Sequence, residues 1–371
     1  MNTSFLQSRS RRRKGAFTII ELVVAIGVTA MLVTIMLYVT VNMLSNWNRT
    51  SGVLNTSNQA RFIINQLTLD LQNSLRADGP EATFVATIQN NQSTDGDADV
   101  TRADWPAADI KPRSTGPHPT DSLIVNFAAA EDRNISVYRF GQAGVWLRFF
   151  ANTVDGEDDE LVNVSAPRAV SYQIVRRQRE NNANAEYSYQ LFRSEVRPFG
   201  NSAADQARST FGVGYDLLGD NAYNDKGSGN TADEDPVRIR RPGLESLIGE
   251  GVVDFGVRIF SRDVGGQLIE TFPVDRRVGN TDASIRLSFV NSIVPNKIPA
   301  FVTTSLNPAA AETSYGRPAV VEVMLRILTP EGIQTIQAYE NDPSRFGGSS
   351  PEKWWELVIQ NSNVYTQRIT L

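Results

Sequence analysis

The sequence contains no cysteine and only one histidine among its 371 residues. The absence of cysteine excludes disulfide scaffolds, thiolate metal sites and cysteine nucleophiles. The single imidazole, His118, excludes a metal centre built from several histidines, and any Ser-His-Asp triad would have to use it. No Gly-x-Ser-x-Gly turn accompanies this histidine, so we expect a protein that is not an enzyme.

Overall composition is ordinary, with 41% hydrophobic and 21% charged residues, but the charge is unevenly distributed. Residues 1–16 carry five basic side chains and no acidic one, whereas residues 22–48 carry no charge. Without residues 1–16, the formal net charge falls from −5 to −10. An acidic protein does not attract nucleic acid non-specifically, so we expect no nucleic-acid partner.

A long apolar run follows the basic segment, and Glu21 is its only charged residue between Phe17 and Asn48. About 20 apolar residues span a bilayer as a helix, so this run predicts a transmembrane helix with its basic flank in the cytoplasm. A cleavable secretory signal is an alternative, although its apolar region is usually about 7–15 residues. An ordinary signal anchor leaves Glu21 unexplained, because a carboxylate in a membrane helix costs about 3 kcal/mol.

The segment Lys-Gly-Ala-Phe-Thr-Ile-Ile-Glu-Leu, residues 14–22, resembles the cleavage and methylation motif of type IV prepilins and type II secretion pseudopilins. The resemblance implies that a prepilin peptidase cuts between Ala16 and Phe17 and that the new amino group of Phe17 is methylated. It also implies that Glu21 pairs with the N-terminal ammonium of a neighbouring subunit, which would compensate the charge within the apolar helix. The processing motif comprises Gly15, Ala16, Phe17, Thr18 and Glu21.

The cleavage register has two alternatives, because this family usually has glycine directly before the cut and Gly15 lies one residue earlier. Cleavage after Ala16 makes Glu21 the fifth residue of the mature chain, and cleavage after Gly15 makes it the sixth. The spacing from Phe17 to Glu21 matches the family, so we favour cleavage after Ala16.

The helix is expected to continue beyond the membrane, because no proline precedes Pro80 and apolar residues recur at helical spacing. This stripe consists of Ala60, Ile64, Leu67, Leu71 and Leu75. Polar residues are expected to fill the other faces of the same helix, namely Asn65, Gln66, Asp70, Gln72 and Asn73. An alternative is a helix break near Gly52.

The chain therefore divides into a leader (1–16), a transmembrane or filament-core helix (17–48), a helix extension that packs on the head (49–79), and an extracytoplasmic β-rich head (80–371). Several runs of the head have strand periodicity or β-branched composition. These runs are Ser122–Phe127, Ile135–Phe140, Val145–Phe150, Val170–Arg176, Tyr187–Phe192, Val252–Phe260, Ser284–Phe289, Val320–Leu328 and Val364–Ile369.

One long helix followed by many strands predicts the α+β class with a mostly antiparallel sheet. Within the head, Gly141–Gly144 is expected to turn a hairpin between Ile135–Phe140 and Val145–Phe150.

The order of two patterns in the last third is similar to the minor pseudopilins of the J type: residues 249–260, then residues 317–326. The large head and the ending at 364–369 resemble the Verru_Chthon cassette protein C branch. The resemblance implies a subunit of a type II secretion pseudopilus or its tip complex, held in the inner membrane. Its partners would be the prepilin peptidase and methylase, other pseudopilins or minor pilins, and the assembly platform. The alternatives are a type IV pilus minor pilin for adhesion or DNA uptake and a membrane-anchored hydrolase.

Acidic loops offer the only candidate metal ligands, and no other cofactor is expected. The alternation at residues 95–99 is like the start of a calcium loop, but Val100 and Pro106 stand where an EF-hand needs glycine and glutamate. The weak calcium candidates are Asp95, Asp97, Asp99, Asp220 and Asp225. The alternative is a set of solvated acidic loops.

A tryptophan pair, Trp354 and Trp355, follows a helix-start pattern at residues 349–353. We expect these rings to pack against the sheet. The alternative is an exposed patch that binds a partner.

Overall fold

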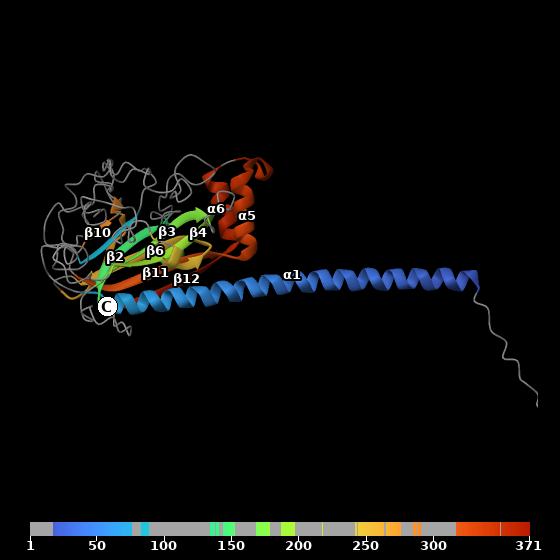
Figure 1. Ribbon diagram of the computed structural model, residues 1–371, viewed down its shortest axis with the longest axis horizontal. Helices are drawn as coiled ribbons and strands as arrows, with labels where there is room; N and C mark the ends of the chain where they lie inside the picture. Colours follow the sequence, from blue (N-terminus) through green and yellow to red (C-terminus); the bar gives the residue numbers. More distant parts are fainter. Residues whose placement is uncertain are drawn as a thin grey trace, which may run out of the picture. The chain divides into compact units, whose positions relative to one another are not determined.

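The computed structural model describes residues 18–75, 83–88, 134–137, 139–140, 144–152, 168–178, 187–196, 217, 242, 244–262, 265–275, 285–286, 288–290, 317–348 and 350–371. The chain forms two compact units, Met1–Ser51 and Gly52–Leu371. The fold class is α+β, as predicted: a long apolar N-terminal helix precedes two antiparallel sheets (Figure 1).

Helix α1 (Ile19–Gln72) is continuous over 54 residues, so the alternative of a break near Gly52 is wrong. Gly52 instead allows a close approach, because a Cβ atom there would lie 3.2 Å from the Cδ atom of Pro330. The helix ends before the predicted limit of residue 79, since Asn73 lies in a turn and Ser74 forms an isolated bridge with Ala151.

The second part of α1 buries one face, as its apolar period predicts. The fully buried side chains of this face are Ala60, Ile63, Leu67 and Leu71. The sequence pattern predicts Ile64 on this buried face, but the fully buried residue there is Ile63, and Ile64 is half-buried. Asp70, which the pattern assigns to one of the other faces, is also buried, at 3% exposure.

The larger sheet has six antiparallel strands in the order β10-β1-β2-β3-β4-β5. Its strands are β1 (Phe84–Ile88), β2 (Val145–Ala151), β3 (Arg168–Gln178), β4 (Tyr187–Val196), β5 (Leu247–Glu250) and β10 (Ser288–Val290). Strands β2, β3 and β4 lie where the sequence predicts them, whereas β1 and β5 are additional strands.

The second sheet has four antiparallel strands in the order β12-β11-β6-β7. Its strands are β6 (Val252–Arg262), β7 (Leu268–Phe272), β11 (Pro318–Leu328) and β12 (Ser362–Thr370). Strands β6 and β11, which carry the two patterns of the last third, are direct neighbours. A small pair, β8 (Val274–Asp275) and β9 (Ile285–Arg286), stands apart from both sheets.

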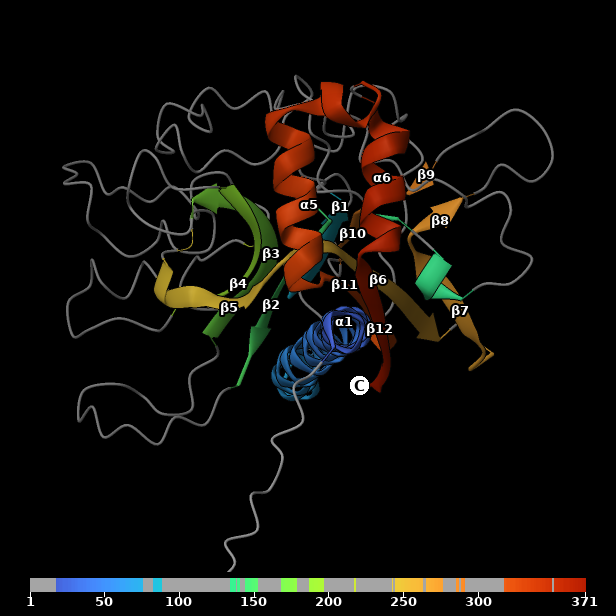
Figure 2. The ribbon, with the colours of Figure 1, turned by 90° about the vertical axis from the view of Figure 1, so that its right-hand side faces the viewer.

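Two helices lie side by side on the head, α5 (Pro330–Asn341) and α6 (Pro351–Gln360) (Figure 2). Both begin with a hydroxyl cap and an early proline: Thr329 accepts from Gly332 N–H, and Ser350 accepts from Lys353 N–H. The start of α6 is therefore confirmed. Three short 3-10 turns complete the described elements, namely η3 (Ile135–Val137), η4 (Leu244–Ser246) and η6 (Pro343–Phe346).

The predicted hairpin between Ile135–Phe140 and Val145–Phe150 is wrong. Residues 135–137 form a 3-10 turn, and β2 pairs with β1 and β3 instead. Phe140 packs against the second sheet instead. Its ring covers Gly256 of β6, where an added Cβ atom would lie 2.1 Å from a ring carbon.

Aromatic rings form the core between the two sheets. Phe84, Phe149 and Tyr172 stack across β1, β2 and β3 with centroids 5.6 and 6.4 Å apart, and Tyr172 reaches Phe255 of β6 at 6.5 Å. Trp354 and Trp355 are also buried, at 0% and 4% exposure, and Trp354 packs edge-on against Tyr189 of β4. The predicted packing of this pair against the sheet is confirmed.

Candidate functional site

The first part of α1 is the most apolar segment of the described chain. Ile19–Leu44 has a mean hydropathy of 2.5, and none of it is buried inside the protein. Its 26 residues are long and apolar enough to cross a membrane. A single helix of this kind near the N-terminus fits a membrane anchor or a secretion signal.

The threonine hydroxyl groups of this segment have backbone partners within the helix. Thr29, Thr34 and Thr40 each donate to the carbonyl oxygen four residues earlier, at 2.7 to 2.8 Å. Unsatisfied hydroxyls are unfavourable in hydrocarbon, so these bonds make the three threonines compatible with a lipid environment.

Glu21 and Thr18 form a capping box at the start of α1. The backbone N–H and the hydroxyl of Thr18 donate to the Glu21 Oε2 atom at 2.9 and 3.0 Å. In return, the N–H of Glu21 donates to the Thr18 Oγ1 atom at 3.3 Å. This reciprocal arrangement satisfies two donors that a helix N-terminus leaves without partners.

The capping box gives Glu21 a partner within its own chain, which the sequence analysis overlooked. The signal was present, because a Thr-x-x-Glu spacing before an apolar run is the signature of this cap. Two of these three bonds end on the carboxylate of Glu21, and both are accepted by Oε2, so the other oxygen is available to a further donor. Glu21 shares its helix face with Ala25, Val28 and Thr29, which line a shallow hollow beside it.

Several predicted residues lie outside the residues that the structure describes: Gly15, Ala16, Phe17, His118 and the calcium candidates Asp95, Asp97, Asp99, Asp220 and Asp225. Of the predicted processing motif, the structure thus places Thr18 and Glu21 and brings them together. Among the described residues, no group of three metal-ligating side chains lies together.

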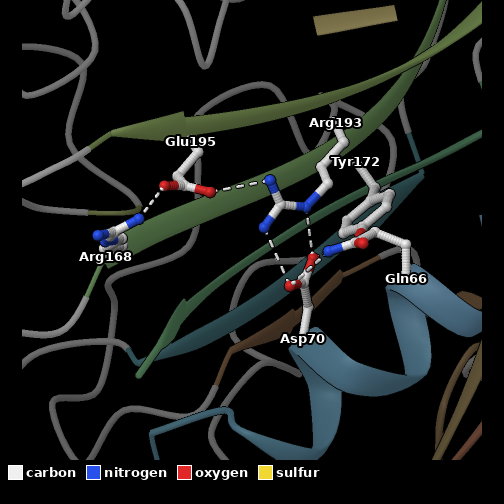
Figure 3. A network of polar contacts seen from close by, with 6 residues as sticks. All are labelled: Gln66, Asp70, Arg168, Tyr172, Arg193 and Glu195. Atoms are coloured by element: carbon white, nitrogen blue, oxygen red, sulfur yellow. Dashed lines mark hydrogen bonds and ion pairs between the residues drawn. The ribbon is translucent and has the colours of Figure 1, made fainter. Parts of the chain in front are cut away.

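A buried polar network joins the last turns of α1 to the larger sheet (Figure 3). Arg193 of β4 binds the Asp70 carboxylate with two nitrogens, at 2.6 and 3.0 Å. The Tyr172 hydroxyl also donates to Asp70, and Gln66 donates at 3.3 Å. Arg193 continues to Glu195 at 2.8 Å. Asp70 is therefore a fully paired structural anchor between helix and sheet.

The pKa shifts of Tyr172 and Arg193 keep both side chains protonated, as donors to Asp70. Burial and the Asp70 charge raise the pKa of Tyr172 well above its ordinary value, so the hydroxyl remains a donor. Burial alone would lower the pKa of Arg193, but its hydrogen bond to Asp70 and the neighbouring negative charges raise it.

A second polar network joins α5 and α6 to the same sheet through Glu340. Arg176 donates to the Glu340 Oε2 atom at 2.9 Å, and the Trp354 indole donates to Oε1 at 3.1 Å. The Tyr189 hydroxyl also donates to Oε1. The head thus uses a paired carboxylate at two of the places where a helix meets the larger sheet.

Asp254 lies fully buried in β6, beside its cross-strand partner Arg326 of β11. The Phe140 N–H donates to both of its oxygens, at 3.1 and 3.3 Å. Burial raises the pKa of Asp254 to about 7, although the Arg326 charge and the Phe140 hydrogen bond oppose this shift. Burial also lowers the pKa of Arg326.

Stability of the head should depend on pH through Asp254. Its pKa is higher in the folded chain than in the unfolded one, so the folded state binds more protons between about pH 4 and about pH 7. Its contribution to the free energy of unfolding is full below that range and falls by about 1 kcal/mol per pH unit within it. Urea unfolding of wild type and Asp254→Asn measures this, and the variant should have the flatter profile. Parallel profiles would contradict the assignment, and Asp342→Asn, at a half-exposed side chain, serves as the control.

Comparison of the chain with protein-family models, with curated proteins and with solved structures returned no match. The evidence for function therefore lies in the chain itself. A long apolar helix followed by antiparallel sheets is consistent with a pilin-like architecture.

Proposed function

We propose that this protein is a pilin-like subunit, made as a prepilin and assembled through its N-terminal helix into a type II secretion-type pseudopilus or its tip complex. Prepilin peptidase removes residues 1–16, and the amino group of Phe17 is methylated. The apolar helix holds the subunit in the inner membrane, with the head on the extracytoplasmic side. The protein is not an enzyme; its work is assembly with sibling subunits that support protein secretion.

One observation carries the proposal: a single carboxylate, Glu21, stands in the first turn of a 26-residue apolar span, directly after a basic segment. The capping box satisfies one oxygen of this carboxylate and leaves the other for an external cation. In lipid, the N-terminal ammonium of a neighbouring subunit is the partner that the resemblance supplies. The apolar helix stores the subunit, and Glu21 sets its register against the neighbour.

Processing gives the direct test of this proposal. When the full chain is expressed with a prepilin peptidase, we expect mass spectrometry to find a mature chain that begins at N-methylated Phe17. The Ala16→Leu variant should stay uncleaved, because the family requires a small residue before the cut. A mature chain that begins at Ala16 would overturn the register alone.

A cut near residue 48 would overturn the whole proposal, because a secretory signal peptidase cuts after the apolar run and discards it. An uncleaved chain in the presence of the peptidase would contradict it equally. The control is the same expression without the peptidase, in which the leader should remain attached.

A further inference from the structure

Strand β12 is the edge strand with the least protection in the described part of the chain. The other edge strands are short or irregular: β10 has three residues, β5 four and β7 five, and the pairings of β5 and β7 contain register shifts. In contrast, β12 has nine residues that pair with β11 without a shift (Figure 2).

The sequence of β12 has few of the usual blocking devices, since Arg368 is its one charged residue. Proteins protect edge strands with proline, charged side chains (above all lysine), bulges or a covering segment. Residues 362–370, Ser-Asn-Val-Tyr-Thr-Gln-Arg-Ile-Thr, contain no proline, glycine or lysine and are rich in β-branched residues. Thr366, Gln367 and Arg368 are exposed, so none of the described segments covers the middle of this edge.

Alternate residues of β12 direct their backbone groups away from β11. The bonds that flank the strand join Leu371 N–H to the Ala319 carbonyl at 3.0 Å and Thr329 N–H to the Asn361 carbonyl at 2.9 Å. Because bonded pairs alternate in an antiparallel ladder, the odd-numbered residues between them bond to β11. The N–H and carbonyl groups of Thr366, Arg368 and Thr370 therefore point to the free edge.

Within the described structure, the free-edge backbone groups of residues 364–370 have one recorded partner: the side-chain amide of Gln367 donates to the Arg368 carbonyl at 3.3 Å. A cleft of about 280 Å³ lies beside this edge, between η3 and the middle of β12. It is lined by Asn134, Ile135, Glu322, Thr366, Gln367 and Arg368. The cleft offers room for side chains next to an open ladder.

The charge at this edge indicates what kind of strand fits it. Arg368 is 56% exposed and shares the Glu322 carboxylate with the buried Arg258, at 3.1 and 2.9 Å. A guanidinium group has five N–H donors, so Arg368 can bind a second carboxylate. Residues 362–371 contain no acidic residue, so a second copy of β12 would not provide one.

We propose that the free edge of β12 binds an extended segment of a different polypeptide as an added strand, with a carboxylate of that segment on Arg368. Backbone hydrogen bonds would hold the segment, and the cleft would receive its side chains. This surface uses neither Glu21 nor the apolar span Ile19–Leu44, so it stands or falls separately from the proposed function.

The test uses the full chain in detergent and labelled nine-residue peptides of alternating Thr and Val. Fluorescence anisotropy compares a peptide with a central Glu, the same peptide with a central Lys, a version with alternate backbone amides methylated, and a peptide of residues 362–371. We expect the Glu peptide to bind about two- to fivefold more tightly than the Lys peptide, and the methylated peptide not to bind.

Thr366→Pro is the matched variant, because its N–H points outward and the bonds to β11 are kept. It should weaken binding about tenfold, whereas Thr366→Val should not. Hydrogen exchange gives a readout without any variant: the amides of Thr366, Arg368 and Thr370 should become protected on binding, and that of Gln367 should not change.

Three results would overturn the proposal. The first is no binding of the unmethylated peptides, and the second is binding without protection of these three amides. The third is tighter binding of the 362–371 peptide than of the Glu peptide, which would assign the edge to a second copy of this chain.

Discussion

Glu21→Ala should be cleaved and methylated like the wild-type protein and yet fail to enter filaments or tip complexes. In the proposed mechanism, processing depends on the residues around Ala16 and Phe17, whereas assembly in lipid requires a carboxylate for the N-terminal ammonium of the neighbour. A buried charge without its partner is strongly unfavourable, so losing the carboxylate should reduce co-purification with sibling subunits at least tenfold, about 1.4 kcal/mol or more. Affinity purification of the full chain from membranes, followed by quantitative mass spectrometry of its siblings, measures this loss.

Because Glu21 also caps its helix, the experiment needs a control that separates this capping role from the negative charge of Glu21. Glutamine also serves at this position of a capping box, so Glu21→Gln keeps the helix cap and removes the charge. We expect Glu21→Gln to fail in assembly as Glu21→Ala does. Thr18→Val removes the side-chain partner of Glu21 but keeps its charge, and it should still assemble. Normal assembly of Glu21→Gln would mean that Glu21 only caps its helix, and the proposed mechanism would then be wrong.

Much of the fold is predictable because its elements bury one regular face. The apolar period of α1 predicts the buried face around Ala60 and Leu67, and the runs within β3, β6 and β11 predict their strands. Strand β1 and helix α5 were missed, since Phe84–Ile88 is short and α5 buries only Gly332, Ile336 and Tyr339. The Thr329-Pro330 cap was the available signal for α5.

Errors arose where a residue depends on a partner far along the chain. The burial of Asp70 is not readable from its local pattern, because its partner Arg193 lies 123 residues later. Residues 135–140 have a strand-like pattern, yet Phe140 is held by Asp254, 114 residues away. Local periodicity carries no information about such pairs, whereas the Thr18–Glu21 capping box, three residues apart, was fully readable from the sequence.

Asp70→Ala should be the most destabilising single change in the buried networks of the head. It removes the acceptor shared by Arg193, Tyr172 and Gln66, and leaves the Arg193 charge half-compensated at 15% exposure. Breaking a buried ion pair from one side costs about 3–5 kcal/mol. Because Arg193 keeps Glu195 at 2.8 Å, we expect a loss near the lower end of this range. Urea unfolding of the full chain in detergent, followed by tryptophan fluorescence, measures it.

A double-variant cycle shows whether this loss belongs to the pair. Asp70→Ala with Arg193→Ala should lose about 1–3 kcal/mol less than the sum of the two single losses, because the second change removes the charge that the first leaves uncompensated. Asp342→Ala is the matched control, since this carboxylate is 46% exposed and its pair with Arg345 should contribute less than about 0.5 kcal/mol. Strictly additive losses would show that Asp70 acts through packing alone. A normal cleavage pattern in Asp70→Ala would in turn separate the stability of the head from the processing of the N-terminus.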